Sequence, residues 1–262
     1  MKAKKSYGQH FLTNEHLAEQ ISKSLRRTDE FERVLEVGPG KGMLTKYLLE
    51  RDFGLTVVEA DRDMVAYLEE HYPALQPHIV AGDFLKVNLA ATMDGKPFGL
   101  IGNFPYNISS QIVFKMIKHR DLVPEMVGMF QKEMADRIIA PPGNKTYGVI
   151  SVLTQAYYEG EMLHKVSRGS FNPPPKVESA VIRLSRKENF SLECDERIFR
   201  TVVKQAFGQR RKMLRNTLKS FFQGTSYYED ALLQERPEQL GLAEFIQLTQ
   251  WATEVQAENQ ND

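Results

Sequence analysis

Short apolar stretches alternate with segments of helical periodicity along about the first 150 residues of the chain. Asn14 is expected to cap a helix whose Leu17 and Ile21 recur at four-residue spacing. Because parallel strands are joined by helices that cover both faces of a sheet, this alternation predicts an α/β domain. The expected strands cover residues 33–37, 55–59, 78–81, 98–102 and 126–130.

The pattern changes in the second half of the chain. Residues 149–157 fit either a helix or a buried strand, and residues 162–166 and 179–184 are expected to pair as antiparallel strands at the sheet edge. After about residue 189 the pattern is purely helical. We therefore expect a Rossmann-like domain over residues 1–188 and a smaller all-helical domain over residues 189–262.

Composition limits where the protein is expected to act. Cys194 is the single cysteine, which excludes an intramolecular disulfide framework, and no apolar run is long enough for a membrane span. The basic first ten residues lead into no apolar signal-peptide core. A cytoplasmic location without a membrane partner is expected.

A glycine-rich turn follows the first expected strand, in the sequence Glu36-Val37-Gly38-Pro39-Gly40-Lys41-Gly42. Such turns open many nucleotide-binding α/β units, although glycines at strand ends also serve ordinary tight turns. The even spacing differs from G-x-G-x-x-G, and Pro39 lacks an amide donor for a pyrophosphate. This pattern favours a ligand without phosphates.

Acidic residues stand at the carboxyl ends of the next two expected strands. Glu59 is placed to accept hydrogen bonds from ribose hydroxyls, and the alternative is a solvated strand end. Asp83 would accept a hydrogen bond from an adenine amine, with Phe84 near the ring, or would cap a helix. Because carboxyl strand ends border the ligand crevice of an open α/β sheet, position favours the binding roles.

The tetrapeptide Asn103-Phe104-Pro105-Tyr106 follows the fourth expected strand at the same edge. An adenine amine is a poor nucleophile because its lone pair is delocalised into the ring. The Asn103 side-chain oxygen and the Phe104 carbonyl would each accept an N6 hydrogen, while Tyr106 stacks on the extruded base. The alternative is a plain β-turn after a strand. At this edge the tetrapeptide favours S-adenosylmethionine-dependent methylation of an exocyclic amine.

An aromatic residue, Phe171, precedes three prolines. The prolines would hold its ring in a fixed place, where it would close the other face of the target base. From this residue alone, a surface turn with an incidental aromatic is the favoured interpretation.

Charge is segregated although the chain has equal numbers of basic and acidic residues, 34 of each. Eight basic residues and no acidic residue lie between Arg197 and Ser220, whereas residues 225–262 carry eight acids and one arginine. Two helices are expected here, with Arg211, Arg215 and Lys219 on one exposed stripe. A basic run is often only a solvated face, but the absence of acids favours binding of a polyanion.

Several segments together resemble the KsgA (RsmA) family of ribosomal RNA small-subunit adenine dimethyltransferases along almost the whole chain. The matching segments are Gly8-Gln9-His10-Phe11-Leu12, the glycine turn, Asn103-Phe104-Pro105-Tyr106-Asn107-Ile108-Ser109, Phe171-Asn172-Pro173-Pro174-Pro175-Lys176-Val177-Glu178-Ser179 and Ala206-Phe207-Gly208-Gln209-Arg210-Arg211-Lys212-Met213-Leu214-Arg215-Asn216. The resemblance implies a class I methyltransferase fold. It also implies dimethylation of the N6 amines of two adjacent adenosines in the 3′-terminal hairpin loop of 16S rRNA, within the immature 30S subunit.

The resemblance and the strand-end positions together define the expected sites. The catalytic set is Asn103, Phe104, Pro105, Tyr106 and Phe171, where the resemblance overrides the surface-turn interpretation of Phe171. The S-adenosylmethionine set is Gln9, His10, Phe11, Leu12, Glu36, Gly38, Gly40, Gly42, Glu59, Ala60, Asp83, Phe84 and Asn103. The RNA-binding set is Lys204, Arg210, Arg211, Lys212, Arg215 and Lys219. A monomer without a metal site is expected.

Two alternatives remain. The erythromycin-resistance methyltransferases share the cofactor motifs and Asn-x-Pro-Tyr but modify 23S rRNA, and the segment from Gln209 to Asn216 argues against them. A non-catalytic assembly or transcription factor is disfavoured by the intact Glu59, Asp83, Asn103 and Tyr106. Phe104 departs from the family, which usually has leucine there.

Overall fold

The structure, a computed structural model, describes residues 10–259 and divides into two compact units. The first unit holds the chain up to Ala135 and Glu159–Arg186, and the second holds Asp136–Tyr158 and Lys187 onward. The chain passes into the second unit for the last time at Lys187, close to residue 189, where the helical domain is expected to begin. Residues 136–158 also belong to this second unit, where helix α7 (Val149–Gln155) packs against α8 (Glu196–Ala206).

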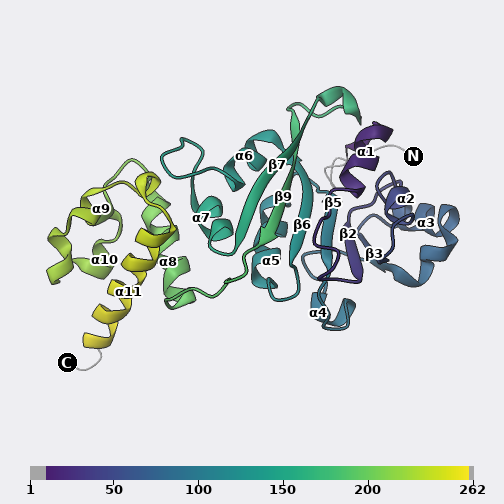
Figure 1. The fold of residues 1–262 in the computed structure, drawn as a ribbon. Helices are drawn as coiled ribbons and strands as arrows, with labels where there is room; N and C mark the ends of the chain where they lie inside the picture. The colour runs from purple at the N-terminus through teal and green to yellow at the C-terminus, as the bar shows by residue number, and fades with distance from the viewer. Residues whose placement is uncertain (1–9, 260–262) are drawn as a thin grey trace. The chain divides into compact units, whose positions relative to one another are not determined.

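A seven-stranded sheet in the order β4-β3-β2-β5-β6-β9-β7 forms the centre of the first unit (Figure 1). The strands β4, β3, β2, β5 and β6 are parallel, whereas β9 is antiparallel to β6 and β7 lies beyond it at the edge. Because the strand order reverses between β2 and β5, a crevice forms at their carboxyl ends. The strand bounds are β2 Arg33–Val37, β3 Gly54–Glu59, β4 Ile79–Ala81, β5 Gly99–Asn103, β6 Glu125–Gln131, β7 Tyr158–Val166 and β9 Ser179–Arg186.

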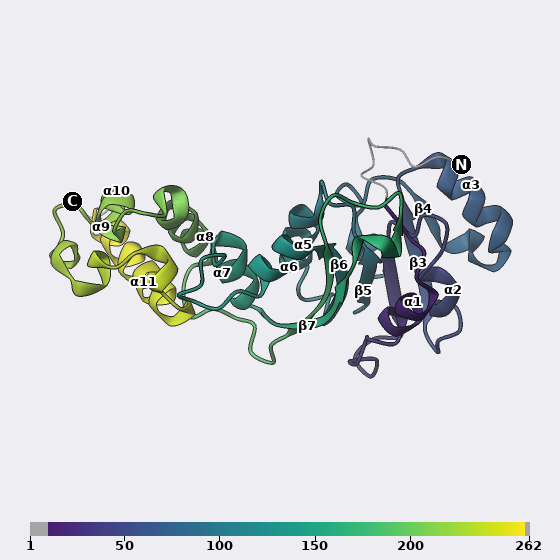
Figure 2. The ribbon, with the colours of Figure 1, turned by 90° about the horizontal axis from the view of Figure 1, so that it is seen from above.

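Helices cover both faces of this sheet, with α1 and α2 on one side and α5 on the other (Figure 2). Leu17 of α1 and Leu48 of α2 are buried in one apolar cluster with Val57 of β3. As predicted, the Asn14 side chain caps α1, and the Asp61 side chain caps α3. The helical bounds are α1 Glu15–Ser22, α2 Thr45–Leu48, α3 Arg62–His71, η2 Pro73–His78, α4 Leu89–Thr92, α5 Ser109–Lys118, α6 Lys132–Ile138 and η3 Arg168–Ser170.

A second, two-stranded sheet joins segments that are far apart in sequence. Strand β1 (Phe11–Leu12) pairs antiparallel with β8 (Phe171–Asn172), and Leu12 lies opposite Phe171. The backbone N–H of Thr13 donates to the Ser170 carbonyl at 2.8 Å and extends this pairing. The pairing places the start of the described chain beside the Asn172-Pro-Pro-Pro segment.

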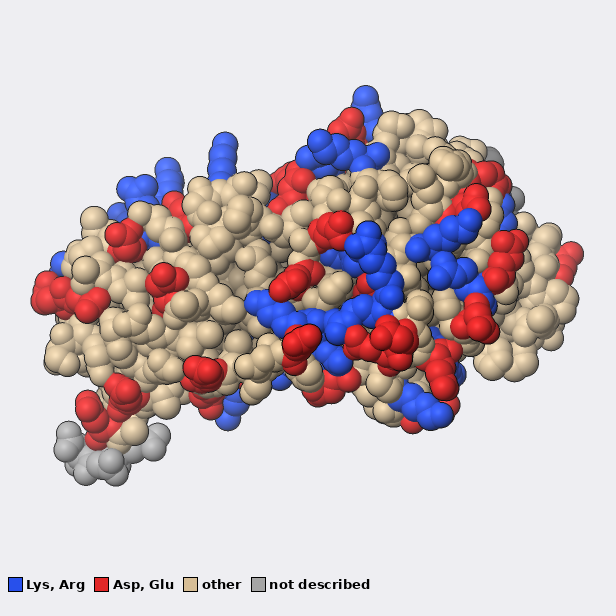
Figure 3. Space-filling model, viewed as in Figure 1, with Lys and Arg blue, Asp and Glu red and all other residues tan. Residues whose placement is uncertain are grey.

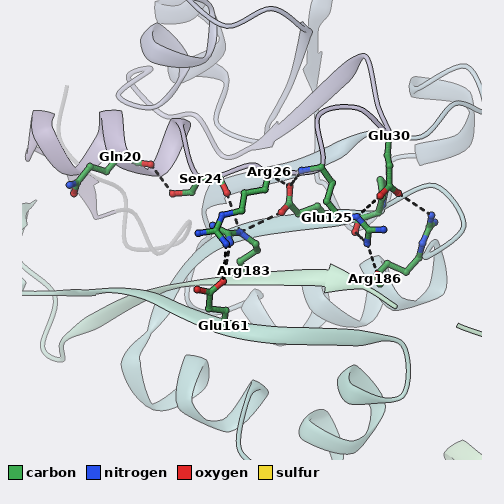
Figure 4. Close-up of polar contacts among 10 residues, drawn as sticks. Gln20, Ser24, Arg26, Glu30, Glu125, Glu161, Arg183 and Arg186 are labelled. Carbon is green, nitrogen blue, oxygen red and sulfur yellow. Dashed lines mark hydrogen bonds and ion pairs between the residues drawn. The ribbon is translucent and has the colours of Figure 1, made fainter. Parts of the chain in front are cut away.

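A buried ionic network connects the loop after α1 to the sheet (Figure 4). The Glu125 carboxylate is fully buried and accepts hydrogen bonds from the backbone N–H groups of Arg26, at 2.8 Å, and Arg27, at 3.1 Å. Its other oxygen lies 3.4 Å from Nε of the buried Arg183, which also donates to the Ser24 carbonyl. Glu161 on β7 contacts the same guanidinium at 2.9 Å. The network thus holds one loop and three strands together.

The second unit is helical apart from its connections. The buried face of α8, which includes Phe199, Val202 and Ala206, packs against α11 (Leu242–Glu258). Its other helical elements are η4 Phe207–Gln209, α9 Leu214–Thr217, α10 Lys219–Phe222, η5 Ser226–Glu229, η6 Ala231–Gln234 and η7 Pro237–Gln239. Among residues 10–259, no helix combines the length and apolarity that crossing a bilayer requires.

The predicted basic stripe on a single helix is wrong. Arg211 precedes α9, Arg215 lies within it and Lys219 begins α10, so the three residues are on different elements. The buried Leu214 and Leu218 keep the four-residue spacing, but contacts of α9 with η6 and of α10 with α11 divide the segment into single turns. Tertiary packing has overridden the local helical pattern.

Candidate functional site

A cavity of about 620 Å³ opens at the carboxyl ends of β2, β3 and β5. This volume lies within the usual range for small-molecule sites. Gln9 is outside the described residues. The predicted cofactor residues that border the cavity are His10, Phe11, Leu12, Glu36, Gly38, Gly40, Gly42, Glu59, Ala60, Asp83, Phe84 and Asn103.

The glycine turn depends on backbone conformations that favour glycine. Gly38, Gly40 and Gly42 have φ angles of +68°, +56° and +80°. A methyl group on Gly42 would lie 2.6 Å from the Tyr72 ring, whose hydroxyl donates to the Gly42 carbonyl at 3.2 Å. A methyl group on Gly40 would lie 3.0 Å from the Phe11 ring. The turn is therefore narrow, and aromatic rings cover it from two sides.

Two buried carboxylates border the cavity. Glu59 accepts the N–H of Gly40 at 3.0 Å and that of Asp61 at 2.8 Å, so the alternative of a solvated strand end is wrong. Burial raises the pKa of Glu59. Burial raises the pKa of Glu36 to about 8, against the opposing effect of the hydrogen bond from Thr45. A cationic ligand such as a sulfonium would oppose this effect of burial, because a nearby positive charge favours the ionised carboxylates.

Asp83 and Phe84 form a second wall that a lysine supports. Asp83 accepts the N–H of Leu85 at 2.9 Å, and Phe84 is buried. Lys115 on α5 donates to the carbonyls of Phe84, at 2.5 Å, and Val87, at 2.6 Å, and its ammonium lies 4.9 Å from the Phe84 ring centroid. Burial lowers the pKa of Lys115. Sequence reasoning missed Lys115 because nothing in a helical lysine identifies a loop about 30 residues earlier as its partner.

The orientation of the Asn103 carboxamide is determined by a single contact. Its Nδ2 donates to the His10 carbonyl at 2.9 Å, which leaves Oδ1 as the acceptor at the cavity. The Tyr106 hydroxyl hydrogen bonds with Ser179 Oγ at 2.6 Å, and its ring stacks on His10 with centroids 5.4 Å apart. Pro105 lies against Gly38, so the two turns are in contact. Burial of Tyr106 raises the pKa of its hydroxyl.

Phe171 does not border the cavity. Its ring is 4% exposed and belongs to the apolar cluster that contains Leu12 and Val166. The β1–β8 pairing contributes to this burial, because side chains of directly opposite residues lie on the same face and Leu12 belongs to the same cluster. The surface-turn interpretation of Phe171 is therefore wrong, while its role at the target-base pocket stays a prediction. Its neighbour Asn172 lies at the cavity wall.

The expected RNA-binding residues form two groups in the second unit. Lys204, Arg211, Lys212 and Lys219 are exposed. Arg210 lies 3.8 Å from Glu238, and Arg215 lies 3.5 Å from Glu229 and 4.9 Å from the Tyr228 ring centroid. In Figure 3, basic side chains project along one edge of this unit, with mostly acidic side chains at the opposite edge. Arg210 and Arg215 therefore also have structural partners within the chain.

A Rossmann-like sheet whose switch-point cavity is bordered by an acidic glycine turn and by Asn-Phe-Pro-Tyr defines a class I methyltransferase. Sequence comparison then specifies the family. The family model described as "Ribosomal RNA adenine dimethylase" matches residues 1–253, and the chain belongs to this family.

Individual relatives agree with this assignment. Proteins named "Ribosomal RNA small subunit methyltransferase A" are 52% identical over 256 residues in Bacteroides thetaiotaomicron, covering 97% of this chain and 96% of the relative, and 52% identical over 250 residues in Flavobacterium johnsoniae, covering 95% of each. A dimethyladenosine transferase from Plasmodium falciparum superposes with a TM-score of 0.77 at 25% identity, covering 94% of this chain and 98% of its own. The 23S rRNA methyltransferase ErmE has a TM-score of 0.67 at 24% identity, covering 92% and 99%, and shares the fold.

Proposed function

We propose that this protein transfers methyl groups from S-adenosylmethionine to the N6 amines of two adjacent adenosines in the 3′-terminal hairpin loop of 16S rRNA. The substrate would be the immature small ribosomal subunit. The observation that carries the proposal is the hydrogen bond from Asn103 Nδ2 to the His10 carbonyl. It leaves the Asn103 oxygen as an acceptor for an amine hydrogen.

The chain's own groups would prepare the adenine amine for attack. When bound, S-adenosylmethionine supplies an electrophilic methyl group on a sulfonium. Asn103 Oδ1 and the Phe104 carbonyl each accept one N6 hydrogen, which localises the nitrogen lone pair and aims it at that methyl. Tyr106 would stack on the extruded base once it displaces the His10 ring, with which it is stacked now. No base is needed before attack, because the proton is lost after the new N–C bond forms.

The cavity walls would hold the cofactor in sections. Glu59 would accept hydrogen bonds from the ribose hydroxyls through lone pairs that Gly40 and Asp61 leave free. Asp83 would accept the adenine amine of the cofactor beside Phe84. Glu36, at the base of the glycine turn, would lie near the cationic part of the ligand.

Substrate choice is supported by two features. Relatives that share about half of the residues are named as small-subunit methyltransferases, whereas the 23S rRNA enzyme is more distant in sequence. In the second unit, rRNA phosphates would be bound by the exposed basic residues Lys204, Arg211, Lys212 and Lys219.

The test is to incubate the protein with labelled S-adenosylmethionine and either small or large ribosomal subunits from a strain lacking the enzyme, and then to map modified adenines. Label is expected in two adjacent adenosines of 16S rRNA. Label only in 23S rRNA would refute the substrate assignment.

Variants of Asn103 test the chemistry separately. Asn103→Ala removes the acceptor and should lower methyl transfer about 100-fold or more, with subunit binding unchanged. Asn103→Asp keeps an acceptor but loses the N–H donor to His10, so its rate of methyl transfer should lie between those of the wild type and Asn103→Ala. Asn189→Ala changes an exposed asparagine and serves as the control. Full activity of Asn103→Ala would refute the mechanism.

A further inference from the structure

The ring of Phe104 fills a notch made by two glycines on neighbouring strands. Gly102 of β5 and Gly128 of β6 are register partners, and Phe104 is 1% exposed. A methyl group on Gly128 would lie 2.3 Å from Cε2 of the Phe104 ring, and one on Gly102 would lie 2.8 Å from Cε1. The ring therefore occupies space that a side chain at either glycine would need.

Two further contacts fix Phe104 in this notch. Its ring meets the Phe130 ring edge-on, with centroids 5.2 Å apart and planes at 69°. Its backbone N–H donates to the Met129 carbonyl at 3.2 Å. Because ring and amide are both held by β6, the strand also determines where the Phe104 carbonyl lies.

We infer that Gly128 is a positioning residue for methyl transfer that acts through the Phe104 ring, so that phenylalanine at position 104 requires glycine at position 128. The inference deepens the proposed function, since it rests on the Phe104 carbonyl accepting an N6 hydrogen. A methyl group 2.3 Å from a ring carbon must move to a contact distance of about 3.5 Å, a shift of roughly 1 Å. The Phe130 ring, 2.7 Å from the same methyl position, prevents a simple sideways movement.

The magnitude follows from how sensitive positioned groups are to displacement. A misplacement of about 1 Å lowers catalysis about 100-fold. Leucine at position 104 has no atom equivalent to the phenylalanine Cε2, so it removes the 2.3 Å contact and opens space into which the Phe130 ring, 2.7 Å from the methyl position, can move. The cofactor walls are formed by Glu59, on β3, and Asp83, after β4. The Gly128→Ala substitution leaves these walls unchanged.

The experiment is a double-mutant cycle with Gly128→Ala, Phe104→Leu and the two combined. It measures kcat at saturating small subunits and the Kd for S-adenosylmethionine. Gly128→Ala should lower kcat about 100-fold with Kd within about threefold of wild type. Phe104→Leu should lose less than about tenfold, and the double variant should return to within about threefold of Phe104→Leu.

Gly99→Ala provides a matched control. A methyl group there would lie 2.7 Å from the Phe31 ring, so it crowds a buried aromatic in the same sheet. Gly99 is at the start of β5, at the opposite end of the strand from Asn103. It should lower the melting temperature as Gly128→Ala does while leaving kcat unchanged.

Each outcome has a defined meaning. Equal kcat losses in Gly99→Ala and Gly128→Ala, or a double variant as slow as Gly128→Ala, would overturn the inference. If Gly128→Ala does not fold, the test is the comparison of Phe104→Leu with the double variant. The inference requires their kcat values to agree. Wild-type activity on large subunits alone would refute the proposed function instead, and the cycle would then be measured on that substrate.

Discussion

Replacing Glu125 with alanine tests whether the buried ionic network stabilises the first unit. The change removes the acceptor of two backbone N–H groups and leaves Arg183, 5% exposed, without its buried counter-ion. Removing one partner of a buried pair costs about 3–5 kcal/mol. Glu161 remains 2.9 Å from Arg183, and its side chain is 55% exposed, so part of the charge stays compensated. We therefore expect the free energy of unfolding to fall by an amount near the lower limit of this range, about 3 kcal/mol.

Two assays measure this change. One is hydrogen exchange of peptides from β6 and β9, and the other is urea denaturation followed by circular dichroism. Arg26→Ala is the control, because its exposed side chain lies 3.8 Å from that of Glu161, which is also exposed, and its backbone N–H is retained. The control should change stability by less than about 0.5 kcal/mol. A loss in Glu125→Ala no larger than in the control would refute the reasoning.

Three further predictions concern single residues, two in the first unit and one in the second. In the cofactor-free protein, the pKa of Glu36 rises from its ordinary 4.5 to about 8, so the folded state keeps a proton that the unfolded chain releases and stability falls as pH rises between these values. Urea denaturation of Glu36→Gln should therefore show a stability gain over wild type that is larger at pH 8 than at pH 5, and a pH-independent difference would contradict it. Lys115→Met removes the donors to Phe84 and Val87 and should raise the Kd for S-adenosylmethionine about tenfold by calorimetry, with Lys118→Met as control. Lys212→Ala should reduce the salt slope of 16S rRNA binding by about one, and an unchanged slope would exclude a phosphate contact.

Much of the site was predictable because its geometry follows from topology. Parallel strands end at the same edge of a sheet, so placing Glu59, Asp83 and Asn103 at strand ends was enough to predict that they border one cavity. Helix caps at Asn14 and Asp61 are equally local, since each bonds a backbone amide two or three residues away. The second unit was harder, because its single-turn helices are stabilised by packing and not by their own sequence.

By itself, the sequence determined the α/β class, the strand-end chemistry and the resemblance to the rRNA adenine dimethyltransferases, because these depend on periodicity and local motifs. Only the tertiary structure decided that Phe171 is buried, that Lys115 supports the Phe84 loop and that Gly128 makes room for Phe104. Each of these facts depends on a partner that lies at least 24 residues away in the chain. Which distant side chains meet is determined by strand register and packing, and a local pattern of residues contains neither.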